Sequence, residues 1–137
     1  MHAPGNFPDY GKEQKPEVTL GDDGVVRVNF GFHARITRAA VEDAHEQHRR
    51  LTPYRAPVLV KGEHVLTVDS EAERFASDPK VVKAVTACAL LPRTILERVI
   101  ARLFLRYARP PYPIRVFADE AEAIDWLKPF VTTERAE

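Results

Sequence analysis

A short apolar run that leads into a capped helix constrains the fold of this chain more than any other stretch. Residues 56–60 read Ala-Pro-Val-Leu-Val, which is apolar without alternation. Such a run predicts a strand covered on both faces. A helix is predicted to begin at Ser70, because Glu73 follows at the capping-box spacing. A central strand followed by a helix predicts an α/β sheet, and open sheets of this kind bind ligands or partners at such points.

Length and composition predict one domain that needs no metal or disulfide to fold. A chain of 137 residues suits a single domain and can bury about two-thirds of its unfolded surface. The single cysteine, Cys88, has no intramolecular partner, which fits a reducing compartment. Lys and Arg number 20, and Asp and Glu also number 20. This balance argues against a general attraction to nucleic acid or to anionic membrane.

The hydropathy pattern predicts a soluble cytoplasmic protein. Residues 1–8 contain three prolines or glycines among polar positions and lack the apolar core of a secretory signal. No apolar run is long enough to span a bilayer. We therefore expect no membrane span.

The predicted order of elements is β-β-α-β-α-β-α-β-α. Residues 1–16 are expected to form a flexible arm, residues 17–130 a single domain, and residues 131–137 a frayed tail. The first two strands should form an antiparallel hairpin around a Gly-Asp-Asp-Gly turn. The later strands should pair in parallel through right-handed crossovers. Strands are predicted at 18–20, 25–30, 57–60, 81–90 and 114–117, and helices at 37–51, 70–77, 93–109 and 119–127.

Three stretches carry a resemblance to a known family. They are residues 23–28, residues 57–60 with 68–72, and residues 113–127. With this order of elements, the chain resembles the STAS-like superfamily, and within it the small actinobacterial "STAS/SEC14 domain-containing" proteins of uncharacterised function. The resemblance implies a mixed sheet with helices mainly on one face. It also implies a binding or regulatory module, not an enzyme.

The same resemblance marks Asp69 and Ser70 as a candidate switch. Anti-sigma-factor antagonists of the superfamily carry a phosphorylated serine or threonine at this place, in a motif that continues with small residues and glycine. Here Glu71, Ala72 and Glu73 follow instead. A phosphate at a helix N-terminus gains from the free N–H groups, but these acidic neighbours oppose it. The alternative is a plain N-cap worth about 1 kcal/mol.

A basic stripe on the longest predicted helix is the second candidate site. Arg98, Arg102 and Arg106 recur every four residues and share one face, with Leu105 at its edge. Such a face suits an acidic or anionic partner, or a homodimer; the alternative is a solvated helix surface. The same helix has one broad apolar face, which comprises Ile95, Leu96, Val99, Ile100, Leu103, Phe104 and Tyr107.

No catalytic, cofactor or metal site is predicted. His45 and His48 share one helix face, but no cysteine pair or His-Glu-x-x-His pattern completes a zinc site. Cys88 lies within an apolar run, as a small buried hydrophobe does. No nucleophile elbow, P-loop or dinucleotide fingerprint is present.

Two functions remain open from the sequence. The first is a non-enzymatic regulatory module that binds an unidentified protein, and not nucleic acid. The alternative is a carrier of a small apolar or lipid-like ligand. That alternative requires a cavity between the long helix and the sheet.

Overall fold

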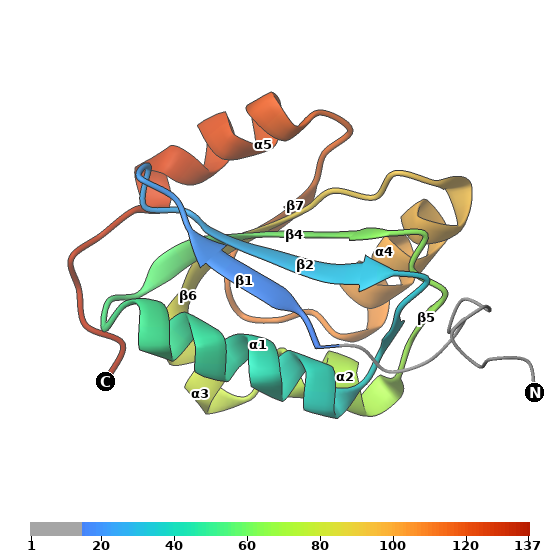
Figure 1. Ribbon diagram of the computed structural model, residues 1–137, viewed down its shortest axis with the longest axis horizontal. Coiled ribbons are helices and arrows are strands. Elements are labelled where there is room, and N and C mark those ends of the chain that lie inside the picture. Colours follow the sequence, from blue (N-terminus) through green and yellow to red (C-terminus); the bar gives the residue numbers. More distant parts are fainter. Residues whose placement is uncertain (1–14) are drawn as a thin grey trace, which may run out of the picture.

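The computed structural model describes residues 15–137, which form a mixed five-stranded sheet with helices on both faces (Figure 1). The sheet order is β1-β2-β4-β6-β7. β1 and β2 pair antiparallel and the other neighbours pair in parallel, so the predicted hairpin is confirmed. The strands are β1 (Glu17–Leu20), β2 (Val26–Phe32), β4 (Ala56–Glu63), β6 (Val85–Leu90) and β7 (Ile114–Val116). Of the predicted arm, residues 1–14 lie outside the described residues.

The hairpin turn is fixed by one glycine and one aspartate. Gly24 has a φ of +82°, which favours glycine because it lacks a Cβ. The Asp23 carboxylate accepts a hydrogen bond from the Val25 backbone at 3.1 Å and pairs with Arg27 at 2.9 Å. These contacts set the register in which Leu20 lies opposite Val26.

The helices divide unequally between the two faces of the sheet. Four of them pack on one face: α1 (Arg38–Leu51), α2 (Ser70–Phe75), α3 (Pro79–Ala84) and α4 (Ile95–Tyr107). α5 (Glu120–Leu127) and the short 3-10 helix η2 (Lys128–Phe130) cover the opposite face. Figure 1 shows α5 across the sheet from α1, α2 and α3. This confirms the predicted α/β fold with helices mainly on one face.

Two short elements were not predicted, and they connect β2 and β4 to the helices that follow. β3 (Arg35–Ile36) and β5 (Thr67–Val68) pair in parallel as a separate two-stranded sheet. Two-residue strands carry too little periodicity to be recognised from sequence. Their pairing lets the Asp69 backbone N–H donate to the Ile36 carbonyl at 2.9 Å, which fixes the start of α2.

The predicted strand over residues 81–90 is wrong in its first half. Residues 79–84 form α3, and only residues 85–90 form a strand. The Asp78 side chain accepts from the Lys80 backbone N–H at 2.9 Å, and Pro79 occupies the first turn. Both features start a helix. An apolar run cannot by itself distinguish a buried helix turn from a buried strand.

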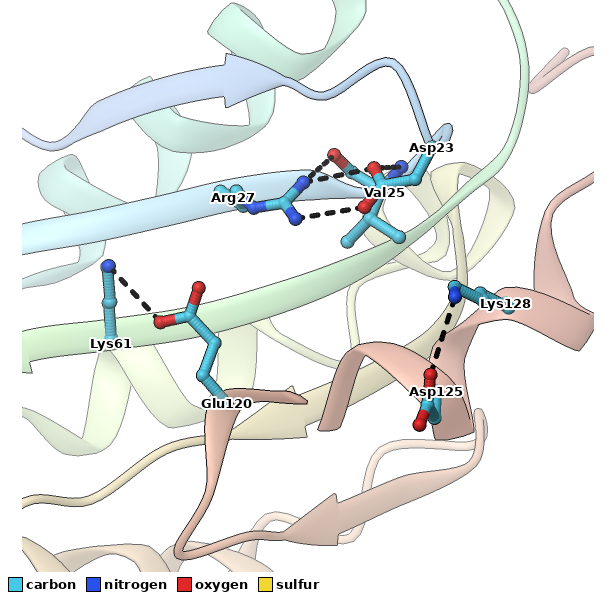
Figure 2. Close-up of polar contacts among 7 residues, drawn as sticks. All are labelled: Asp23, Val25, Arg27, Lys61, Glu120, Asp125 and Lys128. Atoms are coloured by element: carbon cyan, nitrogen blue, oxygen red, sulfur yellow. Dashed lines mark hydrogen bonds and ion pairs between the residues drawn. The ribbon is translucent and has the colours of Figure 1, made fainter. Parts of the chain in front are cut away.

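The second face of the sheet has its own small core. Leu59, Ala87 and Ala89 from the sheet are buried there against Ala123 and Leu127 of α5. An ion pair at its edge joins Lys61 of β4 to Glu120 at the start of α5, with 3.6 Å between Nζ and Oε1 (Figure 2). The small alanines of β6 let α5 lie close to the strands.

Residues 131–137, expected to fray, lie instead along the connection between α1 and β4. Arg55 donates from its backbone to the Glu134 carbonyl at 2.8 Å and pairs with the Glu134 side chain at 2.9 Å. The Ala136 backbone donates to the Pro53 carbonyl at 3.0 Å, and Ala136 is buried. These contacts join residues distant in sequence, so no local sequence pattern predicts them.

Within residues 15–137, no helix combines the length and apolar character needed to cross a bilayer.

Removing the central leucine of β4 should destabilise the protein strongly. Leu59 is completely buried between the two helical layers, so Leu59→Ala should lower the free energy of unfolding by about 2–5 kcal/mol in urea denaturation. Leu51→Ala is the matched control, because Leu51 is 42% exposed at the end of α1 and should lose less than about 1 kcal/mol. Equal losses for the two variants would contradict the assignment of β4 as the covered central strand.

Candidate functional site

A cavity of about 200 Å³ lies between the sheet and the helices α1, α2 and α4. The sheet contributes alternate residues of three neighbouring strands, because side chains two apart share one face. These wall residues are Val28 and Phe30 of β2, Val58 and Val60 of β4, and Cys88 and Leu90 of β6. The wall is therefore built mostly of aliphatic side chains.

Four alanines on the facing helices leave this volume unfilled. Ala44 of α1, Ala72 of α2, Ala76 just after α2, and Ala101 of α4 all line the cavity and are buried. A core is normally packed to crystal-like density, with few voids larger than a water molecule. Small residues on three separate segments therefore point to a built space. Sequence analysis did not predict that these four alanines share one space, since only the assembled fold brings them together.

His48 is the buried polar residue on the α1 side of the wall. It is only 3% exposed, and its Nε2 atom has no hydrogen-bond partner among residues 15–137. Burial is the main cause that lowers the pKa of His48, and the charges of His45 and Arg49 act in the same direction. A hydrogen bond to the Tyr54 backbone partly opposes them, and the resulting pKa is about 4. The imidazole is therefore neutral at physiological pH. His45 on the same helix face is only half-buried, so the two histidines that sequence analysis grouped together lie in different environments.

Glu97 ties the start of α4 to the loop between β4 and β5. Its Oε2 accepts from the Val65 backbone N–H at 2.9 Å, and its Oε1 accepts from the backbones of Arg93 and Thr94 at 2.8 and 3.1 Å. Thr94 accepts in return from the Glu97 backbone at 3.1 Å, which completes a capping box. The Thr-x-x-Glu spacing of this box is visible in the sequence, although sequence analysis began the helix at Arg93 and missed it.

The far end of α4 is also held to the α2 region. Ser77 Oγ donates to the Ala108 carbonyl at 3.4 Å, and the Tyr112 hydroxyl donates to the Ala76 carbonyl at 3.0 Å. Between these ends, Ile100 and Phe104 meet the cavity through half-buried apolar side chains. α4 thus forms a roof that is fastened at both ends and apolar in the middle.

The broad apolar face of α4 is divided between the cavity wall and the solvent. Of its seven residues, only Ile100 and Phe104 line the inner wall. Ile95, Leu96, Val99, Leu103 and Tyr107 are exposed. Buried Glu97 and Ala101 occupy the inner face instead. Apolar residues extend around more than half of this helix, so periodicity alone did not decide which part faces inward.

The candidate interaction residues lie on the outer side of α4. Arg98, Arg102 and Arg106 are exposed, and Leu105 is half-buried. No ion pair within residues 15–137 involves these three arginines. They therefore lie beside the exposed apolar residues as uncompensated positive charges, although the predicted partner role stays a prediction.

The candidate switch residues lie at the start of α2, where the expected capping box does not form. The N-cap is Asp69, and its side chain makes no cap hydrogen bond. Its carboxylate pairs with Arg35 at 3.2 Å. Ser70 is the first helical residue and is exposed. Phosphorylation of Ser70 stays a prediction.

The remaining titratable groups that the sequence singled out are the histidines and Cys88. No group of three or more His, Cys, Asp or Glu among residues 15–137 could hold a metal ion. Cys88 lies on the cavity wall, where burial raises the pKa of its thiol to about 12. That thiol is therefore protonated at neutral pH and is a poor nucleophile.

The neutral His48 should make the stability of the protein depend on pH. The unfolded chain protonates this ring near pH 6.5 and the folded chain only near pH 4. Between these values the unfolded state binds more protons, so the free energy of unfolding should fall as the pH decreases through this window. The full loss amounts to about 3 kcal/mol. Urea denaturation between pH 7 and about pH 4 measures it.

A variant comparison assigns this dependence to His48. His48→Phe should flatten the dependence of the unfolding free energy on pH. His45→Gln should leave most of that dependence in place, because His45 is half-exposed, although burial also lowers its pKa. A profile that His48→Phe leaves unchanged would contradict the assignment.

Truncating Glu97 should loosen α4 more than the rest of the fold. Glu97→Ala leaves three backbone N–H groups without their acceptor, which costs about 1–3 kcal/mol for a buried donor. Hydrogen exchange should accelerate in residues 93–107 and less in β4 and β6. Glu122→Ala is the matched control, because Glu122 holds the same position in α5 and is exposed. Equal exchange in the two variants would contradict the role of Glu97.

The comparisons with known proteins agree with this architecture. The chain is similar in structure to the crystal structure of an uncharacterised protein of the DUF3478 family with a SpoIIAA-like fold from Shewanella loihica PV-4, with a TM-score of 0.51 and 15% sequence identity over 82% of this chain and 91% of that one. That likeness confirms the STAS-like fold expected from the sequence. No curated protein matches the chain. Residues 19–131 match the family described as "Domain of unknown function (DUF7793)", and the chain belongs to that family.

Proposed function

We propose that this protein is a non-enzymatic module that binds a small apolar ligand in the cavity beneath α4. The observation that carries the proposal is the cavity itself, about 200 Å³ in volume with a mainly aliphatic wall. An apolar cavity of about 150 Å³ is large enough to bind benzene. Sites for drug-sized ligands start at about 300 Å³. The volume therefore suits a ligand somewhat larger than benzene, or one end of a longer chain.

The chemistry of the wall favours a neutral ligand. His48 is uncharged at physiological pH because burial lowers its pKa. The Glu97 carboxylate is already bonded to three backbone N–H groups. Lys61 also lines the cavity, but its ammonium group pairs with Glu120 at 3.6 Å. An ion placed in this space would therefore lose its hydration without gaining a free charged partner. An alkyl or aryl group has no favourable hydration to lose when it enters the cavity.

The attachment of α4 supplies a route for the ligand. The helix is fastened by polar contacts at its two ends, whereas Ile100 and Phe104 between them make only apolar contacts to the wall. Both side chains are half-buried. Rotation of such side chains opens the roof without breaking a hydrogen bond of the sheet.

A second candidate function is the protein-binding, regulatory module of the STAS-like type. The exposed apolar residues of α4, next to Arg98 and Arg102, favour it, since aromatic, aliphatic and arginine side chains are typical of interfaces. An unidentified protein or a second copy of the chain would then contact α4. As part of this second candidate, we also propose a cytoplasmic location and membership of the actinobacterial STAS/SEC14 group.

Filling the cavity should abolish ligand binding without unfolding the protein. Heptane added to the labelled wild-type protein should shift amide resonances in α1, β4 and α4 in heteronuclear NMR spectra. Ala44→Leu should lose these shifts, because the added methyl groups occupy the ligand's space. Because these groups enter empty space, the stability should change by no more than about 2 kcal/mol.

Ala39→Leu is the matched control for this experiment. Ala39 lies on the same helix but is exposed, so the larger side chain should leave the heptane shifts intact. Absence of heptane shifts in the wild-type protein, or equal shifts in Ala44→Leu, would overturn the proposed function.

A further inference from the structure

We propose that the outer face of α4 docks on a bilayer surface that contains anionic lipids. This docking face consists of two adjoining stripes along one helix. Its exposed apolar residues are Ile95 at 79%, Leu96 at 48%, Val99 at 47%, Leu103 at 46% and Tyr107 at 69% exposed. Its basic residues are Arg98, Arg102 and Arg106. The proposal depends on this face alone and goes beyond the ligand cavity on the opposite side of the helix.

The apolar stripe is larger than an isolated exposed hydrophobe. Five large side chains occupy one side of a helix of 13 residues, which is about 20 Å long. Single exposed apolar residues are normal on protein surfaces, but a contiguous group marks an interaction site. The helix cannot bury these residues by rotating, since buried Glu97 fixes its other side through the bond to Val65.

The charge on this helix is strongly positive although the chain as a whole is neutral. Residues 93–109 contain five arginines and one glutamate, and that glutamate is buried and fully bonded. Within residues 15–137, Arg98, Arg102 and Arg106 take part in no ion pair. Helices with an apolar side and a basic side bind in the plane of the membrane interface. Juxtamembrane arginines gain from anionic headgroups.

The same charges disfavour a second copy of the chain as the occupant. A two-fold interface pairs a surface patch with itself. It would bring the arginine stripes of both copies together, and the face carries no exposed carboxylate to compensate them. Like charges across an interface oppose association. An anionic bilayer instead offers negative headgroups and an apolar interior to the two stripes at once.

Vesicle sedimentation tests the proposal with the full chain. Sucrose-loaded vesicles of phosphatidylcholine alone are compared with vesicles in which half of the lipid is phosphatidylglycerol. The protein should sediment with the anionic vesicles and remain mostly in solution with the neutral ones. Raising the salt from about 0.1 M to about 0.5 M should weaken this binding, because exposed charges are then screened.

Two variants of the docking face, each with a control variant elsewhere on the surface, test whether vesicle binding depends on the basic stripe and on the apolar stripe. Replacing Arg98, Arg102 and Arg106 together by alanine should lower the partition coefficient about a hundredfold. The control replaces Arg38, Arg50 and Arg74, which are exposed on α1 and α2, and should bind like the wild type. Leu103→Asp should also abolish sedimentation, whereas Leu51→Asp, at a similarly exposed leucine of α1, should not.

Each remaining outcome overturns the proposal. Equal sedimentation with neutral and anionic vesicles would remove the role of the arginines. Wild-type binding by the Leu103→Asp variant would remove the role of the apolar stripe. A wild-type dimer in analytical ultracentrifugation that becomes monomeric in Leu103→Asp would assign the face to a second copy of the chain.

Discussion

The buried carboxylate of Glu97 decides how α4 sits, and the candidate site depends on that helix. Three backbone N–H groups surround it, one of them from Val65 in a different part of the fold. A buried acid with satisfied oxygens cannot turn to solvent without leaving those donors unpaired. The helix is thus held with Ile100 and Phe104 inward and Leu103 outward. Both the roof of the cavity and the docking face follow from this orientation.

The cavity results from side-chain size more than from any opening of the backbone. Side chains alternate between the two faces of β2, β4 and β6, so those on one face form the mainly aliphatic wall of the cavity. The helices face this wall with alanines such as Ala44 and Ala101. Leucine at such positions would fill the space, as Leu59 and Leu127 fill the opposite face of the same sheet. One sheet therefore supports a tightly packed side under α5 and a hollow side under α4.

Neutral overall charge conceals an uneven distribution. The equal numbers of acidic and basic residues argued against attraction to an anionic surface, yet the segment around α4 carries five arginines against one buried acid. Electrostatic attraction to a surface acts over about one Debye length, so the local patch matters more than the sum. An apolar cavity thus lies on one side of α4, and a basic, apolar face lies on the other.

The order of the main elements could be predicted from the amino-acid sequence, because local signals encode it. The hairpin, the apolar strand of β4 and the helix starts at residues 37 and 119 were all predictable. In the structure, the side chains of Thr37 and Asp119 accept hydrogen bonds from the backbones of the helices that they cap. Tertiary structure decided the remainder. The helical start of residues 79–84, the side of α4 that faces inward, the docking of residues 131–137 and the cavity all depend on contacts between segments distant in sequence. Periodicity shows that a segment has an apolar side, but only the neighbours that the fold brings to it decide which side is buried and how completely.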